Sequence, residues 1–290
     1  MNALIWLAIL VAVVAGAVLW PRWRLRRLLA RPLAPELVAL LEQNVPVVGR
    51  MSTELRLQLH QLIQQFLHQK KFVGCAGLEI DDQVRVTIAG QACLLLLNRP
   101  TRVFQLLHTI LVYPSAFLVP RQLRDEAGVV TEGRQDLLGE SWSDGRVILS
   151  WDHVQQGAQD WTDGQNVVLH EFAHQLDSES GSNNGAPYLG SQSSYRSWSA
   201  VLSRDFANLR ADAMYQQQSV MDHYGATSPA EFFAVATETY FEKPHQMADS
   251  HPALFSEFFK YYRVDPRAWQ PAPVVEEAPA YYGTTFGQWQ

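Results

Sequence analysis

The spacing of apolar residues predicts a mainly helical chain with a few short strands. Between 33 and 69, apolar positions such as Leu55, Leu59 and Phe66 recur three and four residues apart, which predicts amphipathic helices. The same spacing returns at 165–176, 198–217 and 229–241. Shorter apolar runs predict strands or buried segments at 84–90 and 92–98, a buried segment leading to a strand at 104–120, and a compact strand at 146–151. The polar, glycine-containing stretch 125–145 predicts a long loop or small hairpin, and 177–194 predicts a surface loop.

The N-terminus interrupts this globular pattern. Residues Ala3 to Trp20 carry no charge, and five arginines follow them between Arg22 and Arg31. A run of this length is at the lower end of what crosses a bilayer, and basic residues after it predict a cytoplasmic location for the rest of the chain. We therefore expect an uncleaved single-pass anchor in the inner (cytoplasmic) membrane. A cleaved signal segment and a buried or peripheral helix are the alternatives.

The pattern along the chain predicts three parts. Residues 1–32 form the anchor and its basic flank, 33–270 form one folded domain, and 271–290 form a mobile tail, because the tail has Pro, Glu and aromatic residues without periodicity. The strand 146–151 is expected either to pair with an extended peptide or to be an ordinary buried strand.

Composition narrows the possible functions. Apolar residues make up 47% of the 290-residue chain and charged residues 18%, which is typical of a folded globular protein. The net charge of −6 argues against direct nucleic-acid binding, because phosphate contacts need clustered Lys and Arg. The two cysteines, Cys75 and Cys93, have no metal-site or disulfide-framework spacing and are expected to be buried thiols.

One motif carries chemistry: His170-Glu171-Phe172-Ala173-His174. Residues four apart on a helix lie on one face, so His170 and His174 can bind one metal ion. Imidazole is a zinc ligand, and Glu171 between them can act as the general base toward a metal-activated water. Apolar neighbours supply the buried flank that such a helix needs, and Asp163 or Asn166 can cap its start.

A hydrolytic zinc site needs a third protein ligand. Glu231, in the segment SPAEFFAVATETYFE, is the first candidate. Ser228, Pro229 and Glu231 also form a capping-box pattern, which explains Glu231 without any metal. Glu238, on the same helical face, and Asp222 remain alternatives. Asp177 is expected either to orient a ligand imidazole or simply to end the helix.

Several segments resemble one family in matching order. They are GLEIDDQVRVTIAGQACLLLL (77–97), ILVYPSAFLV (110–119), GESW (139–142), VVLHEFAHQLD (167–177) and YGATSPAEFFAVATETYF (224–241). The chain thereby resembles the Mlc titration factor A family of bacterial zinc peptidases from about 33 to 270, and more distantly the catalytic core of anthrax lethal factor.

The resemblance implies a role for each matching residue. His170, His174 and Glu231 would bind one Zn²⁺ per chain, Glu171 would be catalytic, and Tyr224 would hydrogen-bond the developing oxyanion. It also implies a mixed α/β (α+β) zincin-like metallopeptidase domain, with the HExxH helix packed on a small sheet and, in this chain, an N-terminal transmembrane helix in addition.

Two functions follow as hypotheses. The first is a zinc metallopeptidase that hydrolyses a peptide or protein substrate, with a regulatory role through a transcriptional regulator. The second is a membrane-tethered binding protein, because the family is named for sequestering a glucose-responsive transcriptional repressor. The complete motif favours the enzyme, since capture alone requires none of these side chains.

Overall fold

The structure is a computed structural model and describes residues 2–100, 103–115, 117–124, 130–137, 139–142 and 145–273. Its longer helices are α1 (Asn2–Leu29), α2 (Pro35–Asn44), α3 (Thr53–Gln69), α4 (Asp82–Leu94), α5 (Trp151–Gln159), α6 (Val167–Asp177), α7 (Gln192–Tyr215), α8 (Pro229–Glu242), α9 (Pro244–Ser250) and α10 (Pro252–Tyr262). The short 3-10 helices are η1 (Pro46–Arg50), η2 (Ser178–Ser180), η3 (His223–Ala226) and η4 (Pro266–Ala268). The strands are β1 (Lys71–Gly74), β2 (Thr109–Tyr113), β3 (Phe117–Arg124), β4 (Val130–Leu137), β5 (Gly139–Trp142) and β6 (Arg146–Ser150).

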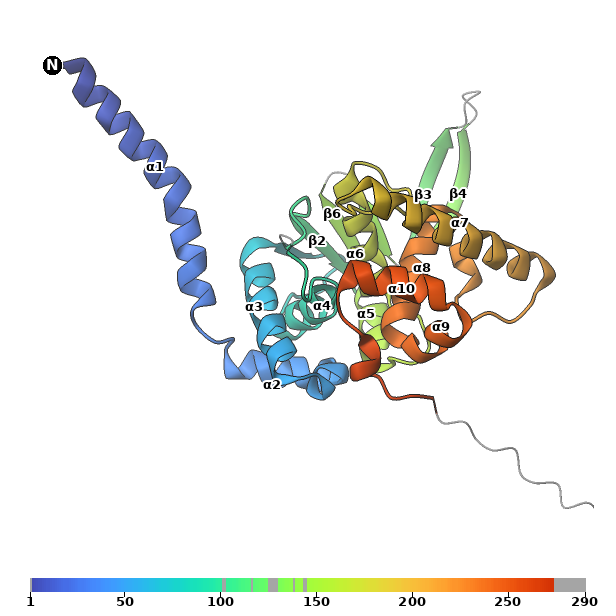
Figure 1. The fold of residues 1–290 in the computed structure, drawn as a ribbon. Coiled ribbons are helices and arrows are strands. Elements are labelled where there is room, and N and C mark those ends of the chain that lie inside the picture. The colour runs from blue at the N-terminus through green and yellow to red at the C-terminus, as the bar shows by residue number, and fades with distance from the viewer. Residues whose placement is uncertain are drawn as a thin grey trace, which may run out of the picture.

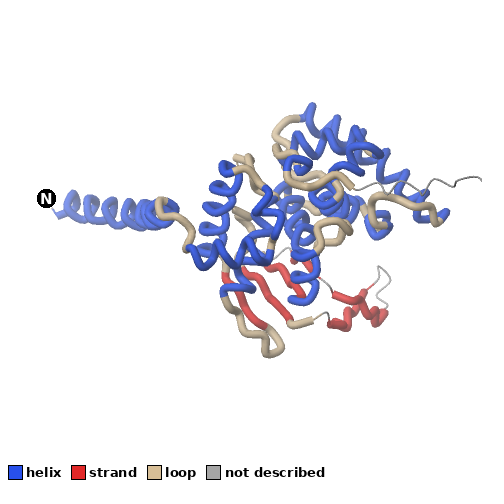
Figure 2. The backbone as a smooth tube through the Cα atoms, turned by 90° about the horizontal axis from the view of Figure 1, so that it is seen from below, coloured by secondary structure: helices blue, strands red, loops and turns tan. Residues whose placement is uncertain are grey.

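A small sheet lies against the helices. Its strand order is β1-β2-β6-β5, with β1, β2 and β6 parallel and β5 antiparallel to β6. Most of the helices gather to one side of this sheet (Figure 2). Strands β3 and β4 form a separate antiparallel hairpin that projects from the body (Figure 1). Strand β6 has neighbours on both sides, so it is a buried interior strand and not a free edge for a peptide.

The segments 84–90 and 92–98, expected as strands or buried segments, are largely buried but form no strand. Residues 82–94 form helix α4, which Asp81 caps by accepting a hydrogen bond from the amide of Val84 at 2.8 Å. Every residue from Val86 to Leu94 is buried, so this part of the helix has no solvent-exposed polar face and shows no amphipathic period. The helix packs tightly on α2, since a Cβ on Gly90 would lie only 2.4 Å from Leu41 Cδ1.

The predicted N-terminal anchor is also wrong. Across the part of the chain that the structure describes, no helix combines the length and the apolar character that a membrane crossing requires. Helix α1 continues past the 18-residue apolar run into a stretch with Arg24, Arg26 and Arg27, and the run itself is shorter than the roughly 20 residues that span a bilayer core. The predicted fold class, an α/β zincin-like domain plus a transmembrane helix, is therefore replaced by a mostly helical fold with a small, mainly parallel sheet. The predicted inner-membrane localisation depended on this anchor and is therefore wrong as well.

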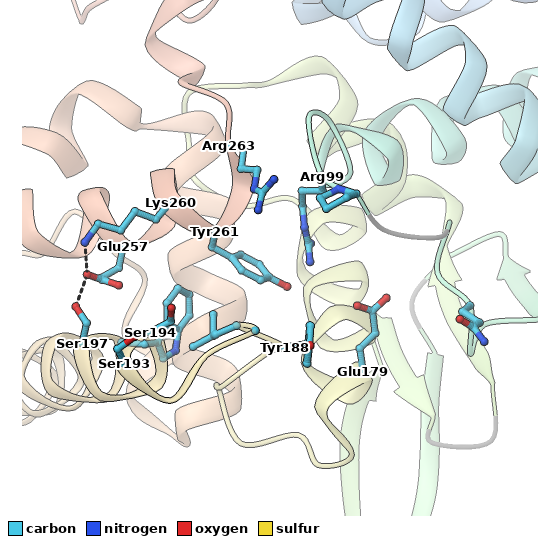
Figure 3. A pocket seen from close by; sticks show the side chains of 15 residues that line it. Arg99, Glu179, Tyr188, Ser193, Ser194, Ser197, Glu257, Lys260, Tyr261 and Arg263 are labelled. Carbon is cyan, nitrogen blue, oxygen red and sulfur yellow. Dashed lines mark hydrogen bonds and ion pairs between the residues drawn. The ribbon is translucent and has the colours of Figure 1, made fainter.

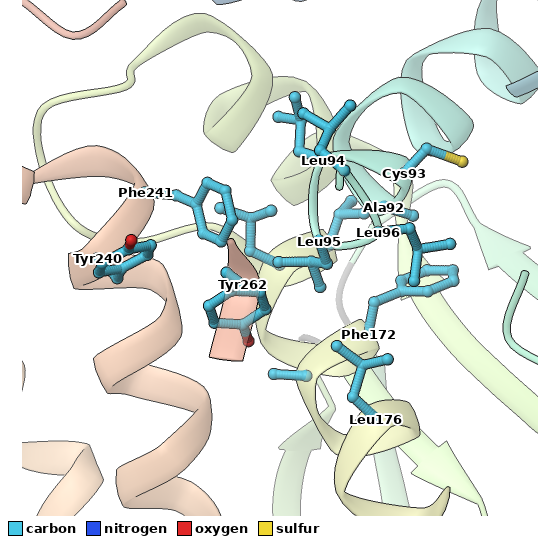
Figure 4. Close-up of a cluster of buried hydrophobic side chains, with 14 of the residues drawn as sticks. Ala92, Cys93, Leu94, Leu95, Leu96, Phe172, Leu176, Tyr240, Phe241 and Tyr262 are labelled. Carbon is cyan, nitrogen blue, oxygen red and sulfur yellow. The ribbon is translucent and has the colours of Figure 1, made fainter. Parts of the chain in front are cut away.

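Helix α6 is held by the main hydrophobic core. Phe172 and Leu176 extend from its buried flank toward the end of α4 and toward α8 and α10 (Figure 4). The Phe172 ring packs edge-on against Phe104, with centroids 4.7 Å apart, and also contacts Phe66. Because this flank is fully buried, the opposite flank of α6, with its histidines, has a fixed orientation. The predicted tail, apart from 271–273, lies outside the described residues.

Candidate metal centre

Asn166 fixes the start of the motif helix. Its side-chain oxygen accepts hydrogen bonds from the amides of Val168 and Leu169, at 3.1 and 3.0 Å, which makes it the N-cap of α6. Its Nδ2 lies 2.9 Å from Gln91 Oε1 and 3.0 Å from Glu242 Oε1. A fully buried amide with this many partners holds the first turn of α6 rigidly against α4 and α8.

The two motif histidines converge on Glu231 of helix α8. His170 Nε2 lies 3.0 Å and His174 Nε2 lies 3.4 Å from the same oxygen, Oε2 of Glu231. The imidazole centroids are 4.9 Å apart. One ligand atom from each of the three side chains lies within 4.8 Å of the others. The structure therefore brings together the three residues that the sequence analysis named first as ligands.

Glu231 serves two purposes at once. Its amide donates to Ser228 Oγ at 3.2 Å, so the capping-box interpretation of this segment agrees with the geometry. The cap fixes the first turn of α8 and so holds the Glu231 side chain over α6. The same residue therefore caps the start of α8 and contacts the two histidines through its carboxylate.

Glu238, an alternative ligand in the sequence analysis, contacts the far side of the His170 ring. Its Oε1 lies 2.7 Å from His170 Nδ1, and its Oε2 accepts a hydrogen bond from the amide of Asn166 at 2.5 Å. Glu238 accepts a hydrogen bond from Nδ1 of His170 and so orients the ring with Nε2 toward Glu231. Glu238 is therefore an orienting residue, and that role was missed. The seven-residue spacing from Glu231, which puts both on one helix face, was the available signal.

The carboxylates make the cluster electronegative. Burial alone would raise the pKa of Glu231, but hydrogen bonds from His170 and His174 outweigh it and lower that pKa to about 2. Burial likewise opposes a charged His170, yet Glu238 and Glu231 outweigh it and raise the pKa of that imidazole well above its usual value. Groups that favour a proton on imidazole also favour a divalent cation in the same place.

Glu171 and Tyr224 flank the three-residue cluster. Glu171 is buried, and its charge acts on both His170 and Tyr224. Tyr224 lies in η3 and is 47% exposed, with its ring centroid 5.9 Å from that of His170. Burial of the hydroxyl, together with the charges of Glu231 and Glu171, raises the pKa of Tyr224 to about 12. The phenol therefore keeps its proton at neutral pH and can donate a hydrogen bond.

Asp222, an alternative ligand in the sequence analysis, and Asp177, an alternative orienting residue, both have structural roles. Asp222 accepts a hydrogen bond from the amide of Tyr224 at 2.7 Å and so caps η3. Asp177 Oδ2 accepts from the amide of Gly185 at 2.7 Å and fixes the loop after α6. His174 Nδ1 has no hydrogen-bond partner among the described residues, so Asp177 does not orient that ring.

The ligand atoms of His170, His174 and Glu231 suit a metal ion of intermediate hardness, such as zinc. Two imidazole nitrogens and one carboxylate oxygen are the ligands that catalytic zinc sites use, with a fourth position left for water or substrate. Glu238 holds the other nitrogen of the His170 ring, Nδ1, as a partner behind a metal-binding histidine does, so Nε2 faces Glu231. His170, His174 and Glu231 can therefore hold one metal ion.

Comparison with known proteins identifies the family. The sequence profile of the glucose-regulated metallo-peptidase M90 family matches residues 20–263. The chain is 40% identical over 259 residues to an uncharacterized protein of Synechocystis sp., covering 89% of this chain and 94% of that protein. It is 32% identical to Mlc titration factor A of Enterobacter sp. and 33% identical to that of Klebsiella pneumoniae, in each case over 77% of this chain and 84% of the relative.

These matches confirm the resemblance inferred from the sequence segments. They cover the helices and strands that build the cluster, including α6, η3 and α8. The chain belongs to the M90 metallopeptidase family, the family of Mlc titration factor A.

Proposed function

We propose that this protein is a zinc-dependent peptidase that hydrolyses peptide bonds, with Glu171 as the general base. The observation that carries the proposal is the convergence of His170, His174 and Glu231 within 4.8 Å, with Glu171 in the same helical turn. Family membership supports it, since the family is one of metallopeptidases. Hydrolysis by activated water is the chemistry that such a set of ligands serves.

The role proposed for each side chain follows from its position in the cluster. His170, His174 and Glu231 hold the metal ion, which lowers the pKa of a water molecule and polarises the scissile carbonyl when bound. Glu171 accepts a proton from the attacking water and later delivers it to the leaving amine. Glu171 is buried and lies in the same helix as the two proposed histidine ligands, which shields its carboxylate from bulk solvent.

Tyr224 is proposed to donate a hydrogen bond to the oxyanion that develops on the substrate. Its ring lies beside His170, while nearly half of the side chain is open to solvent and thus to substrate. A donor aimed at developing charge stabilises the transition state more than the ground state. Asp222 supports this role by fixing the backbone of Tyr224 through its amide.

Strand β5 is proposed to bind the substrate backbone. It is the last strand of the sheet order, paired with β6 on one side only within the described residues. An extended peptide adds to such an edge through main-chain hydrogen bonds.

The Glu171→Gln variant tests the proposed general base. It should fold and bind zinc as the wild type does, because Glu171 is not a ligand, yet lose nearly all hydrolysis of a peptide library. His174→Ala, which removes a ligand, is the matched control and should lose both zinc and hydrolysis. Unchanged turnover in Glu171→Gln would remove Glu171 from the mechanism.

A second function is favoured by the name of the relatives, Mlc titration factor A. By that analogy, the chain would bind a transcriptional regulator, with hydrolysis secondary. A pull-down of a candidate regulator by Glu171→Gln protein separates the two. A full regulatory effect without hydrolysis would favour the binding role, whereas loss of both would favour the peptidase.

A further inference from the structure

A cavity lies apart from the metal cluster. It has a volume of about 620 Å³ and is bounded by the start of α7, the end of α10, the residues after α4 and the loop before α7. Neither the three clustered ligands nor Glu171 or Tyr224 lines it. Figure 3 shows Arg99 and Arg263 along one side and Ser193 and Ser194 of α7 along another, with the Tyr261 ring between them.

The cavity has an excess of positive charge. Lys260, Arg99 and Arg263 contribute cations, and Glu257 and Glu179 contribute carboxylates. Glu257 Oε1 is already held by Lys260 Nζ at 2.8 Å and by Ser197 Oγ at 2.7 Å.

The two arginines remain available to a ligand. Neither Arg99 nor Arg263 forms an ion pair within the described parts of the chain, and Glu179 is the one carboxylate left to balance both. The guanidinium of Arg99 lies 4.2 Å above the Tyr261 ring, which fixes its plane. A guanidinium held in this way can present its donors to a planar or tetrahedral anion.

Tyr261 supplies a donor without a partner. The residue is only 7% exposed, and its hydroxyl forms no hydrogen bond of ordinary geometry among the described residues. Nη1 of Arg99 is likewise buried and unpaired. The Tyr261 hydroxyl is directed toward the space between Arg99 and Glu179 (Figure 3). Buried polar groups are nearly always paired, so two unpaired donors beside one cavity indicate a missing acceptor.

Helix α7 adds to the positive potential. It is 24 residues long and begins at Gln192, and Ser193 and Ser194 of its first turn line the cavity. Ser191 caps this end by accepting from the amide of Ser194 at 3.2 Å. The first N–H groups of a helix carry a partial positive charge and bind phosphate oxygens directly.

We propose that this cavity binds the phosphate group of a small phosphate monoester. Arg263 and Arg99 form ion pairs with the phosphate, the first turn of α7 and the Tyr261 hydroxyl donate hydrogen bonds to it, and Tyr188 and Leu189 cover the organic part. The volume exceeds what a bare phosphate ion needs and falls in the range of about 300–1,000 Å³ that small-molecule sites occupy. The site is independent of the proposed peptidase chemistry.

Calorimetric titration of the full-length protein tests the proposal, with glycerol 3-phosphate, inorganic phosphate and succinate as probes. We expect glycerol 3-phosphate to bind about tenfold more tightly than succinate, since a dicarboxylate offers fewer oxygens at one centre. Inorganic phosphate should bind more weakly than the ester but compete with it. No binding of the ester, or equal binding of succinate, would overturn the proposal.

Substitutions of the cavity arginines test whether the phosphate ester binds in this cavity. Arg263 has φ +59°, a left-handed conformation that Asn tolerates, so Arg263→Asn removes the charge without backbone strain. It should weaken ester binding about tenfold or more, and Arg99→Gln, in a different segment, should do the same. Arg196→Asn removes an exposed charge from α7 outside the cavity and should have no effect. Undiminished binding in both the Arg263 and Arg99 variants would place the ligand elsewhere and contradict the proposal.

Discussion

The Nδ1 atom of His170 lies 2.7 Å from Oε1 of Glu238, whose other oxygen accepts the amide hydrogen of Asn166. One buried carboxylate thus ties the orientation of an imidazole on α6 to the N-cap of the same helix. It does so from α8, which also carries Glu231. Any change in how α6 and α8 pack therefore moves both a histidine and a carboxylate of the cluster.

Glu238→Ala should weaken zinc binding without removing a ligand. The His170 ring loses the partner that fixes its tautomer and rotation, and loss of such a partner typically costs about 10–100-fold in metal affinity. Competition with a chromogenic chelator measures the change. Glu242→Gln is the matched control, because burial raises the pKa of Glu242 well above its usual value and Gln keeps the acceptor for Asn166. Equal zinc affinity in Glu238→Ala and wild type would show that His170 needs no orienting carboxylate.

Tyr224→Phe should lower kcat and leave KM and zinc content nearly unchanged. The variant removes only a hydroxyl that is proposed to bond the oxyanion, and loss of one such donor typically costs about 10²–10³-fold in kcat. Steady-state kinetics on a cleaved peptide gives both constants. Tyr215→Phe, at an exposed tyrosine at the end of α7, serves as the control and should be neutral. A wild-type kcat in Tyr224→Phe would assign the oxyanion to other donors.

The sequence predicted the motif residues on α6 more fully than the residues that orient them. His170, Glu171 and His174 are separated by fixed steps along one helix, so their relation is local and holds in any fold that keeps the helix. The spacing of seven residues places Glu238 and Glu231 on one face of α8, but that this face meets α6 is a tertiary relation that the spacing does not show. Asn166 was one of two possible caps, and only packing against Gln91 and Glu242 distinguishes it from Asp163.

The errors in the fold have the same origin. Helix α4 is buried on nearly all sides, so its apolar residues follow neither the helical period of about 3.6 residues nor the strand period of two. Its β-branched residues Val84, Val86 and Ile88 favoured the prediction of a strand. The N-terminal run was judged by its lack of charge, although its length was at the limit for a crossing and the helix continues through arginines. Short apolar runs without periodicity need tertiary information to be assigned.

Lys70 should make stability depend on pH above neutrality. Its buried Nζ donates to the carbonyls of Phe104 and Leu107 at 2.6 and 2.8 Å, and burial lowers its pKa to about 8 from an ordinary 10.5. Between those values the unfolded chain binds the proton and the folded protein does not. The contribution of Lys70 to the free energy of unfolding therefore rises with pH in that window, by up to about 1.4 kcal/mol per unit.

The comparison with Lys70→Met measures this contribution. Urea unfolding at several pH values from 7 upward gives the difference in unfolding free energy between the two proteins, in which the other titrating groups cancel. We expect the difference to move in favour of wild type as pH rises through the window between about 8 and 10.5. Lys71→Met, at the neighbouring exposed lysine, should show no such trend. A difference that stays constant with pH would mean that Lys70 titrates alike in both states.

Two imidazoles on α6 and the carboxylate of Glu231 are proposed to share one zinc ion. Elemental analysis of purified protein, exchanged against zinc and freed of excess metal, tests it most directly. We predict one zinc per wild-type chain and almost none in His174→Ala or Glu231→Ala, with circular dichroism spectra unchanged. Zinc absent from the wild type, or retained in full by both folded variants, would contradict the account.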